Sequence, residues 1–218
     1  MVRPGSVAAD IGTDHAYLPA ALILNGICPR ALACDLRKGP LSNAAKTVRS
    51  YGLEGKITLR LSDGFDEIEP FEADDFILCG MGGTLMTELV SRAYWLKDPA
   101  KRLILQPQSH AEDIRSWLIH NGFGILREDA CIDSGKLYCA IAAEYTGESR
   151  EFPAAYPYTG ELPKCGKPEA RDYLIKVKER LIKKQEAQLD FGSADEAARL
   201  KEIIDETETL INEMQSDG

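Results

Sequence analysis

Residues 7–19 read VAADIGTDHAYLP, and this stretch decides the fold. Its apolar run breaks at Gly12 into an acidic turn, and a pattern typical of a helix follows. A strand, a glycine turn and a helix in this order begin an α/β domain, whose ligands sit outside the carboxyl ends of parallel strands. Because glycine has no Cβ, Gly12 predicts close approach of a ligand to the backbone.

The two carboxylates of this loop, Asp10 and Asp14, indicate the kind of ligand. A dinucleotide site requires G-x-G-x-x-G and a helix N-terminus for the pyrophosphate, but here Asp14 stands at the second glycine. Carboxylates repel a pyrophosphate and suit a ligand with an amino group and ribose hydroxyls, such as S-adenosylmethionine. The alternative is that both aspartates only cap a turn.

Length and composition indicate a globular protein with one full domain and an appendage. The chain has 218 residues, 44% of them hydrophobic and 28% charged, and no apolar run approaches the roughly 18 residues of a membrane span. We therefore expect a cytoplasmic protein, monomeric or weakly dimeric, without a membrane partner. Its net charge of −9 is mildly unfavourable for nucleic acid, although the local distribution matters more.

Cysteine and histidine usage indicates neither disulfides nor a metal. The six cysteines form no C-x-x-C pair, and four of them lie in apolar, strand-like runs, so they are expected to be reduced core residues. The three histidines are scattered and lack the spacing of metal ligands. We therefore expect no metal.

Strand and helix patterns alternate through the first 120 residues. Strands are predicted at 31–36, 56–61, 74–79 and 102–105, and helices at 40–50, 84–96 and 112–120. Alternation with short loops predicts a parallel sheet covered on both faces.

The sheet is expected to end in an antiparallel hairpin. Two strand-like runs, 123–132 and 137–145, are joined only by residues 133–136, which are too few for the crossover of a parallel pair. A five-stranded parallel sheet closed by a hairpin is the architecture of class I, Rossmann-like methyltransferases rather than of dehydrogenases.

The last third of the chain predicts a helical hairpin. A proline-rich linker reaches Pro168, and two heptad seams follow on either side of Gly192 and Ser193. One long helix is the alternative. The seams run through Leu174, Val177, Leu181, Lys184, Gln188 and Phe191, and through Ala197, Leu200, Ile204, Thr207, Ile211 and Met214. We expect a cofactor-binding domain at 1–148 and a linker with an antiparallel coiled coil at 149–218.

Charge is distributed unevenly over the two predicted helices. Residues 167–184 contain seven basic and three acidic side chains, whereas residues 193–218 contain two basic and eight acidic ones. A basic helix face is suited to phosphates, and a solvated helix surface is the alternative.

Three further strand ends extend the predicted cofactor site. Asp35 follows the second strand, where an acidic residue commonly holds ribose hydroxyls, although it also fits an N-cap. Asp63 follows the third strand and could accept a hydrogen bond from an adenine amino group, or merely form a turn. Residues 80–83 read GMGG and could form the floor beneath the methionine part of the cofactor, or a tight turn.

Taken in order, the motifs of this chain resemble the bacterial TrmK family, the tRNA (adenine-22) N-methyltransferases. The resemblance spans nearly the whole chain, and its ordered set is more specific than any single glycine motif. It rests on residues 7–18, on Asp35 with 38–40, and on the segments 62–65 (SDGF), 77–83 (ILCGMGG), 103–108 (LILQPQ) and 117–123 (WLIHNGF).

The resemblance implies methyl transfer from S-adenosylmethionine to ring nitrogen 1 of adenine 22 in tRNA. The expected cofactor-binding residues are Asp10, Gly12, Thr13, Asp14, His15, Asp35, Leu36, Ser62, Asp63, Gly64, Gly80, Met81 and Gly82. The expected tRNA-binding residues are Lys176, Arg180, Lys183 and Lys184. Relatives usually carry a short helix before the first strand, whereas Met1 lies only a few residues upstream of it here, which would weaken lid or tRNA contacts.

Methylation of ring nitrogen 1 of adenine requires few catalytic side chains. Its lone pair is exposed, so in-line positioning matters more than a strong base, and no acid–base pair is expected. The adenine must leave its stack, and Tyr17 is the candidate to contact it, although a core tyrosine is equally compatible. Asp14 is the second candidate catalytic residue. Rival interpretations are a small-molecule methyltransferase and a noncatalytic nucleoside-binding scaffold.

Overall fold

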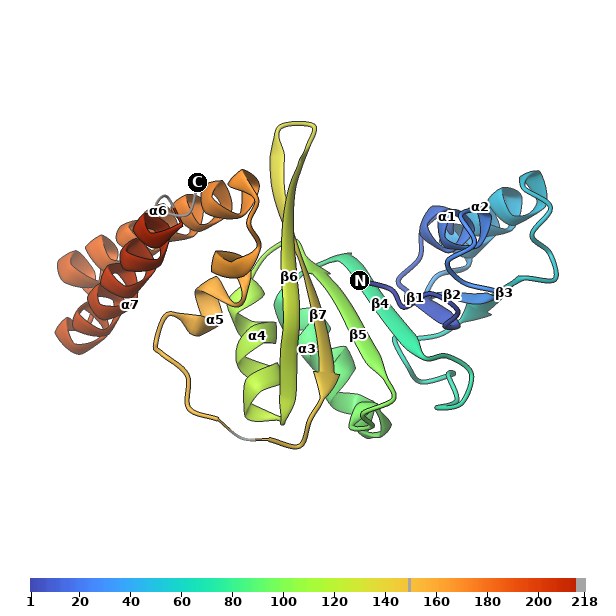
Figure 1. The fold of residues 1–218 in the computed structure, drawn as a ribbon, viewed down its shortest axis with the longest axis horizontal. Coiled ribbons are helices and arrows are strands. Elements are labelled where there is room, and N and C mark those ends of the chain that lie inside the picture. The colour runs from blue at the N-terminus through green and yellow to red at the C-terminus, as the bar shows by residue number, and fades with distance from the viewer. Residues whose placement is uncertain (149, 215–218) are drawn as a thin grey trace.

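Seven strands form one sheet in the order β3-β2-β1-β4-β5-β7-β6 (Figure 1). The structure is a computed structural model and describes residues 1–148 and 150–214. The first five strands in the chain are parallel, and β7 joins β5 in antiparallel orientation. This confirms the predicted Rossmann-like methyltransferase sheet. The strands are β1 (Ala8–Ile11), β2 (Ala31–Asp35), β3 (Ile57–Leu61), β4 (Asp75–Met81), β5 (Arg102–Pro107), β6 (Phe123–Asp133) and β7 (Lys136–Tyr145).

Helices cover both faces of the sheet. Side chains alternate along a strand, so Ala8 packs on one face with α1 (Tyr17–Leu24) and α2 (Lys38–Ser50). Its neighbour Ala9 packs on the other face with α3 (Gly83–Arg92) and α4 (Ala111–His120). The predicted helix 84–96 is shorter than expected, because it ends at Arg92 and a 3₁₀ turn follows.

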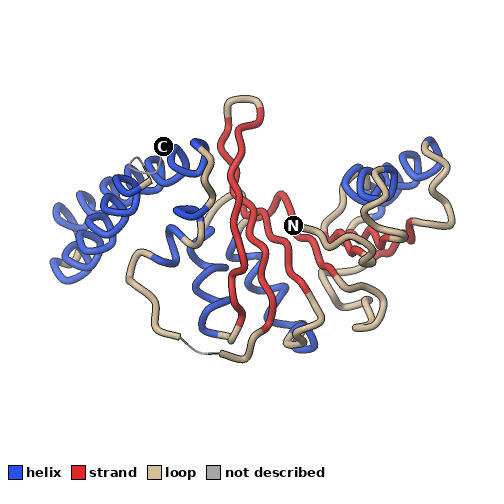
Figure 2. Tube along the Cα trace, viewed as in Figure 1, coloured by secondary structure: helices blue, strands red, loops and turns tan. Residues whose placement is uncertain are grey.

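The β6–β7 hairpin extends well beyond the other strands (Figure 2). Its turn places Ser134 and Gly135 at φ of 48° and 76°. Two successive positive φ values match the right-handed twist of a two-residue hairpin turn, and a glycine adopts such an angle without strain. The hairpin tip therefore stands clear of the sheet with a fixed register.

The segment after the sheet is more ordered than predicted. The proline-rich stretch contains α5 (Tyr156–Thr159) and a 3₁₀ turn at Leu162–Lys164. Residue 149, where the second domain is predicted to begin, lies outside the described residues, as do residues 215–218 at its end.

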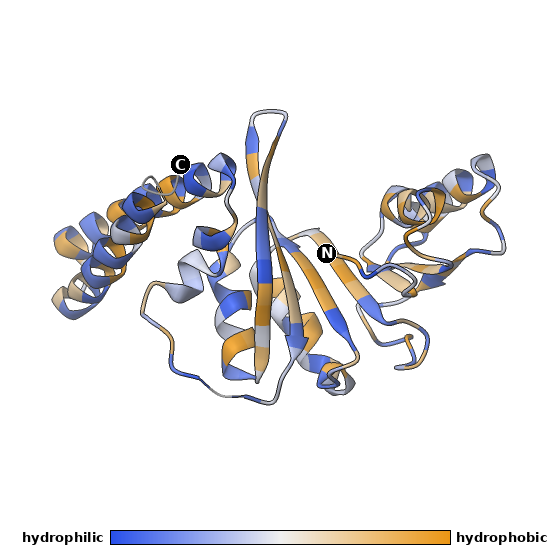
Figure 3. Cartoon of the chain, in the orientation of Figure 1, coloured by the Kyte–Doolittle hydropathy of each residue, from blue (hydrophilic) through white to orange (hydrophobic). Residues whose placement is uncertain are grey.

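Two antiparallel helices, α6 (Pro168–Phe191) and α7 (Ala194–Glu213), complete the fold and exclude the single long helix. Apolar residues alternate with polar ones along both (Figure 3). Leu181 packs against Leu200 and Ile204 in a shared cluster. In α6 the predicted seam is wrong at Lys184 and Phe191, which are exposed, Phe191 to 93%. The predicted α7 seam is buried from Ala197 to Ile211.

A buried ion pair fixes the C-terminal segment to the sheet. Arg115 of α4 donates two hydrogen bonds of 2.8 Å to the carboxylate of Glu128 on β6. The same guanidinium donates to the carbonyl oxygens of Pro157 and Tyr158 in α5. Both charged side chains are almost fully buried. Strand, helix and C-terminal segment thus share one set of hydrogen bonds.

No helix among residues 1–148 and 150–214 is both long and apolar enough to cross a membrane.

The buried pair predicts a large loss of stability when one partner is removed. Glu128→Ala should lower the free energy of unfolding by about 3–5 kcal/mol, because Arg115 would stay buried without its counter-charge. Asp205→Ala is the matched control, since it removes the exposed partner of Lys201 and should cost less than about 1 kcal/mol. Chemical denaturation of both variants measures the difference, and equal losses would contradict the role given to Arg115.

Candidate functional site

The loop after β1 brings the carboxyl ends of three strands together. The N–H groups of Gly12 and Thr13 both donate to the carbonyl oxygen of Cys34 on β2, at 2.9 and 2.8 Å. Gly12 has a φ of 83°, and a Cβ there would lie 2.8 Å from the Met81 methyl carbon at the end of β4. A side chain at Gly12 would therefore be strained and would crowd Met81.

Asp10 lies in the middle of this arrangement. It pairs in register with Ala33 of β2 and Ile77 of β4, and it is only 8% exposed. Burial raises the pKa of its carboxyl to about 6, and a hydrogen bond with Thr13 opposes this shift. Asp10 has no ion-pair partner within residues 1–148 and 150–214, and a buried carboxylate of this kind is suited to a ligand that brings positive charge.

Neither loop carboxylate caps the following helix. Helix α1 begins after Ala16, which has no side-chain capping bond, and Thr13 Oγ1 accepts from the Ala16 N–H instead. Asp14 lies exposed at the surface, 3.3 Å from His15 Nε2. Neither aspartate therefore caps α1, although the hydrogen bond between Asp10 and Thr13 lies within the predicted turn.

Tyr17 lies at the surface, so the alternative of a core tyrosine is wrong. Its residue is 63% exposed, and its ring stacks on His15 with centroids 5.1 Å apart and planes 8° apart. The pair presents a flat aromatic surface beside the Gly12 loop. Such a surface can receive a flat ligand.

Asp35 ends β2 as predicted and is 8% exposed. One carboxylate oxygen accepts the Arg37 N–H at 2.7 Å, so the aspartate forms a local turn rather than a helix cap. The second oxygen has no hydrogen-bond partner in the described part of the chain and stays available to a hydroxyl donor. Leu36 beside it is 62% exposed.

The loop after β3 is more occupied than the sequence indicated. The Ser62 hydroxyl donates to the Gly64 carbonyl and accepts the Glu67 N–H, so it stabilises the turn itself. Asp63 lies 3.2 Å from the guanidinium of Arg92 on α3. The sequence alone does not reveal Arg92 as the partner of Asp63, because their distance along the chain gives no sign of this pairing.

The GMGG segment connects β4 to α3. Gly82 precedes the helix, and a Cβ on Gly83 would overlap the carbonyl oxygen of His110, so the loop after β5 lies directly against it. The Gly80 N–H donates to Gln106 Oε1 at 3.1 Å, and the Gln108 N–H donates to the Met81 carbonyl. Glycine lets these two loops approach closely.

Gln106 and Gln108 are functional candidates that sequence analysis did not name. Their signal was present in the LQPQ motif at the predicted end of β5. Gln106 Nε2 is buried without a hydrogen-bond partner within residues 1–148 and 150–214.

The donor set fits S-adenosylmethionine. Asp10 offers a buried carboxylate for an ammonium group, and Asp35 keeps an oxygen free for a ribose hydroxyl. The loop amides of Gly12 and Thr13 are already used by Cys34 and leave no cradle for a pyrophosphate. Among the described residues, no three His, Cys, Asp or Glu side chains are grouped to hold a metal ion.

The predicted basic face lies on α6. Lys176, Arg180, Lys183 and Lys184 are all exposed, and Arg180 pairs with Glu112 of α4 at 2.9 Å. Lys178, on the same helix, pairs with Glu208 of α7. The acidic second helix thus neutralises Lys178, whereas Lys176, Lys183 and Lys184 have no ion-pair partner in the described part of the chain.

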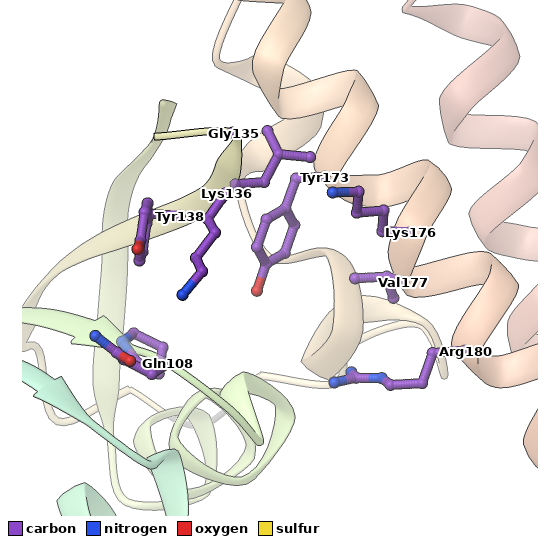
Figure 4. Close-up of a pocket in the computed structure, with 10 residues that line it drawn as sticks. Gln108, Gly135, Lys136, Tyr138, Tyr173, Lys176, Val177 and Arg180 are labelled. Carbon is purple, nitrogen blue, oxygen red and sulfur yellow. The ribbon is translucent and has the colours of Figure 1, made fainter. Parts of the chain in front are cut away.

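A groove of about 490 Å³ separates α6 from the β6–β7 hairpin (Figure 4). Pro107 and Gln108 at the carboxyl end of β5 form its floor, next to Met81. The sequence alone does not reveal this groove, because its walls are more than thirty residues apart in the chain. Its polar lining consists of Gln108, Lys136, Tyr138, Tyr173, Lys176 and Arg180.

Comparison with known proteins identifies the relatives of this chain. Residues 1–141 match the family model described as a methyltransferase domain. The tRNA (adenine(22)-N(1))-methyltransferase of Bacillus subtilis (strain 168) is 33% identical over an alignment of 215 residues, which covers 94% of this chain and 89% of that protein.

Solved structures of similar fold include members of the same group of methyltransferases. The B. subtilis m1A22 tRNA methyltransferase TrmK has a TM-score of 0.81 at 30% identity, covering 98% of this chain and 93% of that one. Sp1610 of Streptococcus pneumoniae, solved in complex with S-adenosyl-L-methionine, has a TM-score of 0.80 at 30% identity and covers 94% of both chains. The fold, the motif order and these relatives show that the chain belongs to the tRNA (adenine(22)-N(1))-methyltransferase family.

Proposed function

We propose that this protein transfers a methyl group from S-adenosylmethionine to ring nitrogen 1 of adenine 22 in tRNA. The observation that carries the proposal is the meeting of the β1, β2 and β4 loops around buried Asp10, in a chain related to such enzymes over 94% of its length. We also propose that it acts in the cytoplasm, as a monomer or weak dimer.

Residues of the sheet end would hold the cofactor. Asp10 would accept from the ammonium group, Asp35 from a ribose hydroxyl, and the Gly12 and Met81 loops would enclose the remainder. Asp63 would reach an adenine amino group only if it shares its carboxylate with Arg92. The remaining predicted contacts, at Thr13, Asp14, His15, Leu36, Ser62, Gly64, Gly80 and Gly82, would shape the walls of this pocket.

The chemistry requires alignment more than proton transfer. When bound, S-adenosylmethionine supplies an electrophilic methyl group on its sulfonium. The stacked rings of Tyr17 and His15 would support the extruded adenine with its lone pair toward that methyl. Correct alignment of two reactants lowers a barrier by roughly 7–11 kcal/mol, so no strong base is needed. Asp14 would act by orienting His15.

The two parts of the chain would divide the work. Residues 1–148 would hold the cofactor and the target base, and residues 149–218 would present the basic face of α6 to tRNA phosphates.

Methyl transfer from labelled S-adenosylmethionine tests the activity directly. We expect wild-type transcript to be labelled and a transcript with guanine at position 22 to remain unlabelled. Labelling of both transcripts would contradict the proposed position. If neither transcript is labelled although calorimetry shows that the protein binds S-adenosylmethionine, a small-molecule substrate would be favoured.

Asp10→Asn tests the cofactor site. Wild-type affinity for S-adenosylmethionine should rise as pH rises from about 5 to about 7, because a carboxyl with a pKa of about 6 gains its charge over this range. The variant should bind weakly at every pH. Asp205→Asn is the control, since it removes one exposed negative charge on α7, and it should keep the wild-type affinity and pH profile in calorimetry.

The same variant has an opposite effect on folding. The folded-state pKa of Asp10 is raised from 3.8 to about 6, so ionisation of Asp10 opposes folding. The free energy of unfolding therefore falls as pH rises from about 4 to about 6. At pH 7.5, Asp10→Asn should therefore unfold at higher denaturant concentration than wild type, with a gain of at most about 3 kcal/mol. A destabilised variant that also fails to bind would contradict this placement of Asp10.

Charge reversal on α6 tests the tRNA interface. Changing Lys176, Lys183 and Lys184 together to Glu should weaken tRNA binding and reduce the slope of log affinity against log salt by about 3, roughly one for each lost phosphate contact. Affinity for S-adenosylmethionine should stay unchanged. Unaltered tRNA affinity and slope would remove α6 from the interface and leave its charges as a solvated surface.

A further inference from the structure

The groove between the β6–β7 hairpin and α6 combines cations from two separate elements. Lys136 comes from the hairpin tip, whereas Lys176 and Arg180 come from α6. Figure 4 shows the Lys136 side chain and the Arg180 guanidinium directed into the hollow. Among the described residues, none of those that line the groove carries a carboxylate. The hollow therefore favours an anion.

Two of these cations are free to meet a ligand. Within the described ranges, neither Lys136 nor Lys176 has an ion-pair partner, whereas Lys178 is paired with Glu208 and Arg180 with Glu112. The pair with Glu112 holds Arg180 at the edge of the groove. Free lysines facing one hollow are suited to a phosphate.

Tyrosines add an aromatic surface to the same groove. Tyr173 of α6 is held in place, because its hydroxyl oxygen accepts from Cys139 Sγ at 3.2 Å. Tyr138 of β7 is half-buried, and its hydroxyl has no hydrogen-bond partner in the described part of the chain. Basic grooves with exposed aromatic rings bind single-stranded nucleic acid, because bases stack on the rings while cations follow the backbone.

The position of the groove connects it to the proposed methyl-transfer site. Its floor residue Gln108 donates its N–H to the carbonyl of Met81, and its side chain lies 3.9 Å from the place of a Cβ on Gly80. The groove and the cofactor loops are therefore neighbours along the same end of the sheet. An RNA strand with one base at the cofactor would pass over Gln108.

We propose that this groove holds a nucleotide next to the target adenine on the same RNA strand. Its phosphate would lie between Lys136 and Lys176, and its base would stack on Tyr138. When an adenine leaves its stack, its neighbour loses a stacking partner, and Tyr138 supplies a replacement. The inference rests on the proposed tRNA methylation and adds the hairpin tip to the substrate-binding surface.

Four single variants test the groove: Lys136→Glu, Tyr138→Ala, Tyr138→Phe and Lys46→Glu. Lys46 is exposed on α2 and lies apart from the groove, so Lys46→Glu controls for the change in net charge. The readouts are tRNA affinity by fluorescence anisotropy, KM for tRNA, and affinity for S-adenosylmethionine by calorimetry, which reports an intact fold.

Lys136→Glu should weaken tRNA binding about tenfold and reduce the salt slope by about 1, as for loss of one phosphate contact. Tyr138→Ala should raise KM for tRNA by about 5-fold to 100-fold, which is the range for loss of one stacked base. Tyr138→Phe keeps the ring and should remain within about twofold of wild type. Lys46→Glu should resemble wild type, and no variant should lose cofactor affinity.

A transcript without the base on one side of the target adenine identifies the stacked nucleotide. With the correct neighbour removed, wild type and Tyr138→Ala should methylate equally. If wild type methylates adenine 22 while Lys136→Glu and Tyr138→Ala behave as Lys46→Glu does, the groove proposal is overturned and the proposed function stands. If wild type methylates no tRNA, the proposed function fails, whatever the groove variants bind.

Discussion

The buried pair of Arg115 and Glu128 joins the sheet to everything that follows it in the chain. Removing two charges from water is unfavourable unless every hydrogen-bonding group finds a partner. Here the carboxylate is bound at both oxygens and the guanidinium also reaches two carbonyl groups of α5. A Cβ on Gly160 would collide with this pair, so the chain can pass it only at a glycine. This requirement fixes the path of the chain into α6.

That path determines where the groove lies. Leu174 of α6 packs in one cluster with Ala130 of β6 and Cys139 of β7, which lie beside the ion pair. Cys139 Sγ accepts from Arg115 at 3.8 Å and donates to the Tyr173 hydroxyl. The wall of the groove is thus fixed to the same buried network, and α6 is held at a set distance from the hairpin. A flexibly attached helix pair would not present Lys176 opposite Lys136.

Charge is separated along one end of the sheet. Buried Asp10 and Asp35 gather where β1 and β2 end, while Lys136, Lys176 and Arg180 gather beyond the end of β5. A cationic cofactor and an anionic RNA strand therefore have distinct positions, with Gln108 and Met81 between them. This division explains how a chain with a net charge of −9 can present a surface to nucleic acid.

The sequence by itself determined the order and type of the strands and helices, because apolar periodicity and the glycine turns are local. It also placed Asp10, Gly12, Asp35 and Met81 at strand ends, and strand ends of a parallel sheet share one edge. It could not show that Asp63 pairs with Arg92, or that Phe191 of the predicted helix seam is exposed, since both depend on what packs nearby. Tertiary structure alone decided the groove, because Gln108, Lys136 and Lys176 meet only after the Arg115–Glu128 pair has fixed the path of the chain. Contacts between distant segments leave no periodic trace in a sequence.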